Sequence, residues 1–76
     1  MADHTLDAKG LHCPLPILKA RKALKAVPAG GTLEVFATNP GTLADFEAFC
    51  RQTGNELLLH SQDDSVDRFL IKRPAA

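Results

Sequence analysis

Two prolines, one residue apart, restrict the local structure of this chain more than any other feature. They lie in the segment Cys13-Pro14-Leu15-Pro16. Proline fixes φ near the helical value and lacks an N–H group, so it suits the first turn of a helix but not its interior. We therefore predict that a helix begins at Pro14, with Pro16 as its third residue and Cys13 at the N-cap position.

The predicted position of Cys13 has a chemical consequence. The start of a helix carries partial positive charge and free N–H groups, here those of Leu15 and Ile17, which favour a thiolate over a thiol. We therefore expect a lowered pKa for Cys13, which would make its sulfur a better nucleophile at neutral pH. The alternative is a small buried apolar residue at the end of a loop. The flanking glycine and prolines favour the first interpretation.

Length and composition limit the classes of protein to consider. A chain of 76 residues suffices for one small core, so we expect a single domain over residues 1–76. Nine Lys and Arg residues balance nine Asp and Glu residues, which implies no general attraction to nucleic acid or to membranes. Two cysteines are too few for a disulfide scaffold, and we see no signal peptide or membrane span. These features predict a cytoplasmic protein that meets its partners through local patches.

The apolar spacing along the chain predicts a small α/β fold. Strands are expected at residues 4–8, 32–38, 56–61 and 67–73, and helices at 14–27 and from 42 to a stop at Gly54. Thr42 and Asp45 match a capping-box pattern at the start of the second helix. The order βαβαββ implies a two-layer α/β (α+β) sandwich, with two helices on one face of a four-stranded mixed sheet.

The same spacing separates core residues from surface residues. One side of the first helix and alternate residues of the second strand are expected to face the core: Ile17, Ala20, Ala23, Leu24, Val27, Leu33, Val35 and Ala37. In the second helix, Cys50 falls on the apolar face with Leu43, Phe46 and Phe49. Three apolar strand residues, Phe36, Leu58 and Leu70, are expected on the open side of the sheet.

The outer face of the first helix mixes apolar and basic residues. Leu15 and Leu18 lie there beside Arg21, Lys22 and Lys25. Both leucines fall within about one helical turn of the cysteine, so a partner that approaches the sulfur should touch them first. This pattern predicts a docking surface, although a solvated basic helix face with two exposed leucines is an equally ordinary interpretation.

Several of these segments resemble one known family, the TusA (SirA-like) sulfur-carrier proteins. The matching blocks at the start of the chain are Leu6-Asp7-Ala8, Gly10-Leu11, Cys13-Pro14-Leu15-Pro16 and Arg21-Lys22. Further similar blocks follow at Pro28-Ala29-Gly30, Thr32-Leu33, Asn39-Pro40, Phe49-Cys50, Glu56-Leu57 and Leu70-Ile71-Lys72-Arg73. The similarity therefore extends over nearly the whole chain. One departure is Asn39, where the family often has aspartate.

The resemblance implies a function and its partners. Cys13 would accept sulfane sulfur as a persulfide from a cysteine desulfurase or a rhodanese and pass it to an acceptor such as a DsrE-type or TusD-type protein. Gly10, Pro14 and Pro16 would shape the helix start that presents the sulfur. Such a carrier is a sulfurtransferase-type relay rather than a stand-alone enzyme, and it needs no metal or other cofactor.

It is expected to be a monomer that forms transient complexes and binds neither membranes nor nucleic acid directly. The pathway could be tRNA 2-thiouridine formation, sulfur oxidation or cofactor synthesis.

Two other functions are compatible with parts of the sequence. A thiol–disulfide redox protein also places cysteine at a helix start, but Pro16 occupies the position of the second cysteine in a Cys-x-x-Cys motif. An RNA-binding or protein-binding regulatory module can share this fold outline. The zero net charge and the lack of Tyr and Trp argue against an RNA-stacking surface. A metal site at His4, His12 and Cys13 lacks the usual ligand spacing.

Overall fold

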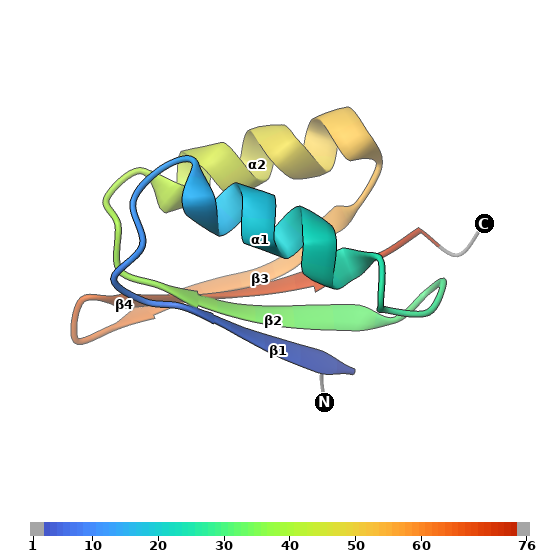
Figure 1. Cartoon of the computed structure of the whole chain (residues 1–76), viewed down its shortest axis with the longest axis horizontal. Coiled ribbons are helices and arrows are strands. Elements are labelled where there is room, and N and C mark those ends of the chain that lie inside the picture. The colour runs from blue at the N-terminus through green and yellow to red at the C-terminus, as the bar shows by residue number, and fades with distance from the viewer. Residues whose placement is uncertain (1–2, 75–76) are drawn as a thin grey trace.

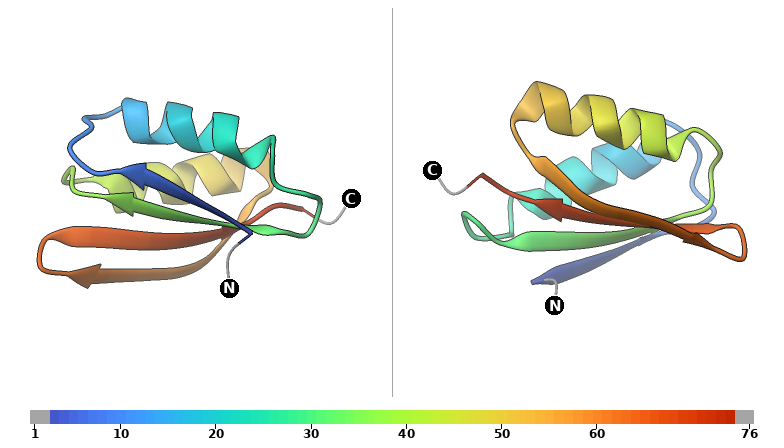
Figure 2. Two further views of the ribbon diagram at one scale, coloured as in Figure 1. Left: turned by 60° about the horizontal axis from the view of Figure 1, so that its bottom comes forward. Right: turned by 180° about the vertical axis from the view of Figure 1, so that it is seen from behind.

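The computed structural model describes residues 3–74 and confirms the predicted order of elements. Within those residues it contains the strands β1 (His4–Ala8), β2 (Thr32–Ala37), β3 (Glu56–Asp63) and β4 (Val66–Lys72), and the helices α1 (Leu15–Leu24) and α2 (Thr42–Thr53). Both helices lie on the same face of the sheet, and Figure 2 shows the opposite face uncovered (Figures 1 and 2). Neither helix of the described part of the chain is long and apolar enough to cross a bilayer.

The strands form one mixed sheet in the order β1-β2-β4-β3. Strand β1 pairs with β2 in parallel, while β4 pairs antiparallel with both β2 and β3. Helices α1 and α2 each connect strands that run in the same direction, and β4 is inserted between β2 and β3 (Figure 1). Because β1 and β2 are adjacent and parallel, the loops that follow them leave the sheet at the same edge.

The core lies between the sheet and the two helices, as the apolar spacing predicts. Its buried strand residues include Leu33, Val35 and Ala37 of β2, which alternate with more exposed neighbours. Phe46 of α2 packs against Phe69 of β4, with ring centroids 4.8 Å apart. The remaining buried apolar residues are Ala8, Ala20, Leu24, Val27, Phe49, Cys50 and Ile71. The predicted core residues Ile17, Ala23 and Leu43 are only partly buried at its margin.

Helix α1 is shorter at both ends than the sequence predicts. It begins at Leu15 with Pro14 as its N-cap residue, so Pro16 occupies the second helical position rather than the third. At the other end, the α-helix stops at Leu24, and the amides of Lys25, Ala26 and Val27 donate to carbonyls three residues earlier. This tighter coil keeps Val27 in the core, which explains why the apolar spacing extends past the end of the α-helix.

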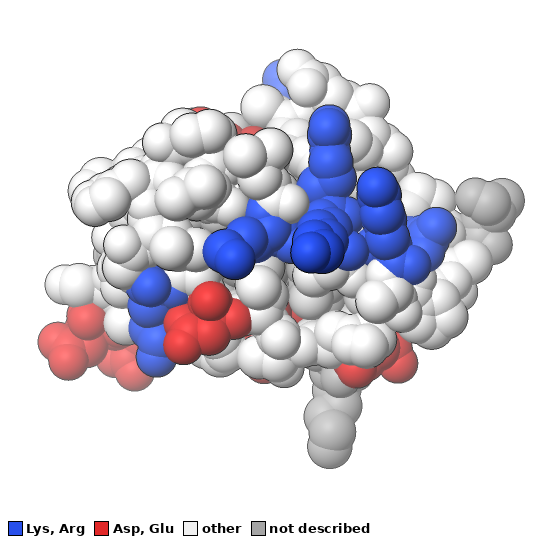
Figure 3. All heavy atoms as spheres, viewed as in Figure 1, with Lys and Arg blue, Asp and Glu red and all other residues white. Residues whose placement is uncertain are grey.

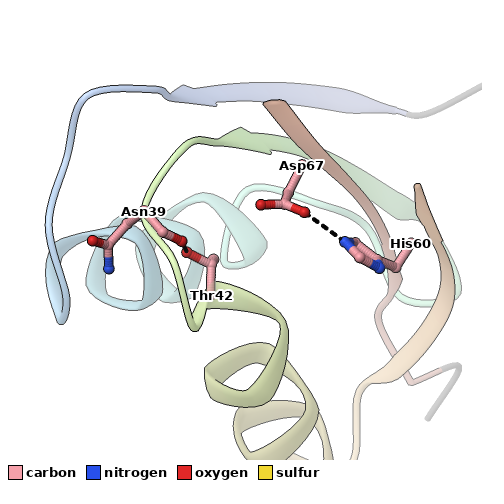
Figure 4. A network of polar contacts seen from close by, with 4 residues as sticks. All are labelled: Asn39, Thr42, His60 and Asp67. Carbon is pink, nitrogen blue, oxygen red and sulfur yellow. Dashed lines mark hydrogen bonds and ion pairs between the residues drawn. The ribbon is translucent and has the colours of Figure 1, made fainter. Parts of the chain in front are cut away.

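The start of α2 differs from the predicted capping box. The N-cap residue is Gly41, with φ of 87°, and Thr42 is already inside the helix. Instead of capping the helix, the Thr42 hydroxyl donates to the carbonyl of Asn39 in the preceding turn (Figure 4). A residue in the left-handed conformation at this position favours glycine, so the cap depends on backbone conformation rather than on a side chain. The helix ends at Gly54, as predicted, with φ of 80°.

The terminal hairpin is longer than predicted and contains an irregularity. Its turn is reduced to Asp64 and Ser65, which both have positive φ. The pairing of β3 with β4 shifts between Leu57 and Leu59, which is typical of a β-bulge. Leu58 and Leu59 are both largely exposed as a result, and Leu59 lies opposite Leu70. The open side of the sheet is therefore partly apolar, as expected from Phe36, Leu58 and Leu70.

Candidate functional site

The loop between β1 and α1 is held in place by hydrogen bonds that its backbone amides donate. Gly10 has φ of 81°, a conformation in which a side chain is unfavourable. Its amide donates to the hydroxyl of Thr38 at 2.9 Å, which ties the loop to the end of β2. The amide of Leu11 donates to the carbonyl of Ala8 at 3.2 Å. The predicted scaffold role of Gly10 thus has a physical basis in the conformation of this loop.

Cys13 lies at the end of this loop, exposed to solvent and with a free thiol. It immediately precedes the N-cap residue Pro14, and the Cys13–Pro14 peptide bond is cis. The predicted N-cap position for Cys13 is therefore wrong by one residue. The amide of Leu15 donates to the carbonyl of His12 at 2.8 Å, so this N–H group is not free to bind the sulfur as expected. Pro16 is buried, which anchors the first turn of the helix.

The electrostatic environment of Cys13 is the reverse of the predicted one. A hydrogen bond from the thiol to the Asp45 carboxylate raises the pKa of Cys13, and slight desolvation and the negative charge of Asp45 act in the same direction. The sulfur lies one residue outside the cap, where the partial positive charge of the α1 start acts on it less strongly. The expectation of a lowered pKa is therefore wrong for the free protein. The thiol form is favoured at neutral pH.

Asp45 is the site residue that sequence reasoning missed. It lies in the first turn of α2, where a carboxylate stabilises the helix, so its presence is explained without reference to Cys13. The parallel pairing of β1 with β2 brings the loops that carry Cys13 and α2 to the same edge of the sheet. The predicted crossover topology already indicated that Cys13 and the start of α2 lie close together, since the loops that follow two adjacent parallel strands leave the sheet at the same edge.

The predicted docking residues divide into two groups along α1. Leu15 and Leu18, at the end nearest to Cys13, are 45% and 51% exposed. Arg21, Lys22 and Lys25 are exposed further along, and Lys25 lies just past the helix as its C-cap residue. Figure 3 shows Lys and Arg side chains gathered across the middle of the face on which α1 lies. The surface from Leu15 to Lys25 therefore extends away from the sulfur along the helix instead of surrounding it.

Cys50 and His60 occupy structural positions. Cys50 is 5% exposed in the core, and burial raises its pKa to about 11. His60 lies 2.8 Å from the carboxylate of Asp67 and stacks on Phe69, beside the start of α2 (Figure 4). Cys50 has the buried position predicted from its helix face, and it differs from Cys13 in both exposure and chemical environment.

The fold and this site define a small α/β protein with an exposed cysteine before the first helix. The family profile described as Sulfurtransferase TusA matches residues 4–73. The chain is 52% identical over 71 residues to the sulfur carrier protein TusA of Allochromatium vinosum, covering 93% of each chain. It is 51% identical over 72 residues to a putative sulfur carrier protein of Neisseria meningitidis, covering 95% of this chain and 97% of that one.

Structural comparison agrees with the sequence comparison. The crystal structure of a SirA-like protein from Desulfitobacterium hafniense superposes with a TM-score of 0.82 at 27% identity, covering 93% of this chain and 97% of that chain. The chain belongs to the TusA family. The names of its relatives support a sulfur carrier role, and membership of this family implies interaction with proteins that donate and accept sulfur.

Proposed function

We propose that the protein carries one sulfane sulfur atom as a persulfide on Cys13. The observation that supports this most directly is the exposed free thiol before α1, in the Cys-Pro-x-Pro segment of a TusA family member. A relay thiol must be reached by a cysteine of a donor and then by a cysteine of an acceptor. Cys13 is accessible in this way, whereas Cys50 is buried in the core.

Sulfur transfer to Cys13 needs no oxidant or reductant. The Cys13 thiolate attacks the outer sulfur of a donor persulfide, and a new S–S bond forms while the S–S bond of the donor breaks. The donor cysteine leaves as a thiolate and takes up a proton from solvent, which balances the proton that Cys13 released. Delivery repeats the same exchange, with the thiolate of the acceptor attacking the outer sulfur on Cys13.

Asp45 limits the fraction of Cys13 that is in the thiolate form, and so it affects the rate of this exchange. Since its carboxylate raises the pKa of Cys13, only a small fraction of the free carrier is in the reactive thiolate form at neutral pH. A donor that places a cation beside Asp45 would offset its charge and favour the thiolate within the complex. The reactive sulfur would then be exposed mainly to the correct partner, which limits unwanted oxidation of the free protein.

The docking surface of this relay comprises Leu15, Leu18, Arg21, Lys22 and Lys25. The two leucines supply an apolar contact beside the sulfur, while the cations provide steering towards an acidic partner surface. A small surface of this kind suits a monomer that forms transient complexes. By family resemblance, the donor is a cysteine desulfurase or a rhodanese, and the acceptor is a DsrE-type or TusD-type protein. The output is tRNA thiolation or sulfur oxidation, in the cytoplasm.

The proposal is tested by loading the protein with sulfur and measuring its intact mass. Incubation with a cysteine desulfurase and cysteine, or with a rhodanese and thiosulfate, should add about 32 Da, the mass of one sulfur atom. Cys13→Ser should remove the adduct, because no other exposed thiol lies within residues 3–74. Cys50→Ser is the matched control and should still be loaded. Persulfide on Cys13→Ser would refute the proposal, and the donor that loads faster indicates the pathway.

A further inference from the structure

A cavity of about 300 Å³ lies between the C-terminal ends of the two helices. Leu24 and Phe49, which are nearly buried, contribute apolar surface to it. Asn55, after the end of α2, adds a polar side chain. Arg21 is already about 12 Å along the chain from Cys13 at the helical rise of 1.5 Å per residue, so the cavity is separate from the sulfur site. Of the residues that line it, the proposed sulfur relay uses only Arg21 and Lys25, at the far end of the docking surface.

Three cationic side chains line this cavity without a carboxylate among them. They are Arg21 and Lys25, at the end of α1, and Arg73, after β4. Within residues 3–74, none of the three forms an ion pair with Asp or Glu. The chain has no net charge, so acidic residues were available to balance such a cluster. An anion bound among the three cations would reduce the repulsion between them.

Arg73 has a fixed position in this cluster. Its Nη1 atom donates to the carbonyls of Leu24, Lys25 and Val27, at 2.5 to 3.5 Å. These carbonyls form the negative end of α1, which would otherwise repel an anion. Because Arg73 satisfies them, the end of the helix presents a guanidinium to the cavity instead of bare carbonyl groups. The site is therefore partly preorganised for negative charge.

We propose that this cavity binds a small phosphomonoester, with the phosphate held by Arg21, Lys25 and Arg73. A phosphate dianion matches three cations better than a single carboxylate does, and the planar guanidinium groups suit paired phosphate oxygens. The apolar surface of Leu24 and Phe49 would contact the organic part of the ligand. The volume lies at the lower end of the range for small-molecule sites, which favours a small ligand. The site does not involve the sulfur of Cys13, but it shares Arg21 and Lys25 with the proposed docking surface.

The experiment is a titration of the ¹⁵N-labelled full chain with phenyl phosphate at constant ionic strength and pH, followed by amide chemical shifts. Phenyl phosphate should give saturable shifts centred on Asn55 and Arg73. Inorganic phosphate should bind more weakly because it lacks the organic group, and benzoate should bind more weakly because it carries one charge. Arg21→Gln and Lys25→Gln should each weaken binding by about tenfold, as expected for a charge-assisted hydrogen bond.

Lys19→Gln is the matched control, since it removes one exposed cation from α1 but does not line the cavity. It should change the affinity for phenyl phosphate by less than about twofold, as a distant screened charge would. An equal loss in Lys19→Gln and Lys25→Gln would overturn the proposal, because binding would then reflect the general field of the surface. Benzoate that binds as tightly as phenyl phosphate, or shifts that do not saturate, would also overturn it. The same holds if the protein binds an oligoribonucleotide but does not bind phenyl phosphate.

Discussion

At the scale of single residues, the reactivity of Cys13 depends on Asp45. The carboxylate accepts a hydrogen bond from the thiol and repels the thiolate, and both effects raise the pKa of Cys13. The exposed thiol is therefore less reactive in the free protein than its position before a helix suggests. The chemistry of the site is determined by a residue on another element, which becomes a neighbour only in the folded chain.

We expect Asp45→Asn to lower the pKa of Cys13. The substitution removes the negative charge but keeps a side chain of the same size, so a thiolate becomes less unfavourable. The pH dependence of alkylation by iodoacetamide measures this pKa, and its midpoint should move to lower pH. Glu47→Gln is the control, because it removes an exposed carboxylate from the same helix without any effect on Cys13. A midpoint that stays the same in Asp45→Asn would show that Asp45 does not govern the thiol.

At the scale of elements, alternation and helical spacing predicted which segments form strands and helices. The strands at 4–8 and 32–38 were predicted within one residue, because each alternates in burial. The helix ends were less well predicted. The prolines indicate the first turn of α1 without distinguishing the N-cap from the first helical residue, since neither position needs an N–H group for an intrahelical hydrogen bond. The predicted capping box of α2 was wrong, because Gly41 in the left-handed conformation is the N-cap residue and no side chain caps the helix.

A second element-scale feature is the contact between Arg73 and the end of α1. Because its guanidinium satisfies three carbonyls there, we expect Arg73→Ala to lower the free energy of unfolding by about 1–3 kcal/mol. Urea denaturation followed by circular dichroism measures this change. Hydrogen exchange of the Ala26 and Val27 amides should also accelerate, since their turn loses its anchor. Lys72→Ala alters an exposed neighbour and should change stability much less. Equal losses in both variants would show that the Arg73 contacts contribute nothing particular.

At the scale of the whole molecule, the sequence predicted the two-layer fold but not the electrostatics of the site. The order of elements limits the topology, and the parallel pairing of β1 with β2 follows from a helical crossover. The contact of Cys13 with Asp45 depends on two loops that meet at one edge of the sheet, and no local pattern contains it. The cationic cavity likewise joins residues from three distant segments. The burial of Cys50 was predicted because it follows from the apolar spacing of its helix.

The burial of Cys50 also affects the stability of the whole molecule at high pH. Its pKa is about 11 in the folded protein, compared with an ordinary value of 9.0 that applies to the unfolded chain. Between these two values the unfolded chain loses the Cys50 proton while the folded protein retains it. Since stability falls with pH where the folded state binds more protons, this thiol should destabilise the protein as the pH rises through that interval.

We therefore expect the free energy of unfolding to decrease between pH 9 and 11 by up to about 2–3 kcal/mol from Cys50 alone. Other groups titrate there as well, so the quantity to compare is the slope of stability against pH in the wild type and in Cys50→Ala. The variant should be less stable at pH 7 because it leaves a cavity in the core, yet its slope should be shallower. Cys13→Ala removes the exposed thiol, whose pKa Asp45 also raises, so its slope shows how much of the pH dependence comes from that cysteine instead. Parallel slopes for wild type and Cys50→Ala would mean that Cys50 has the same pKa in the folded and unfolded states, which would contradict this prediction.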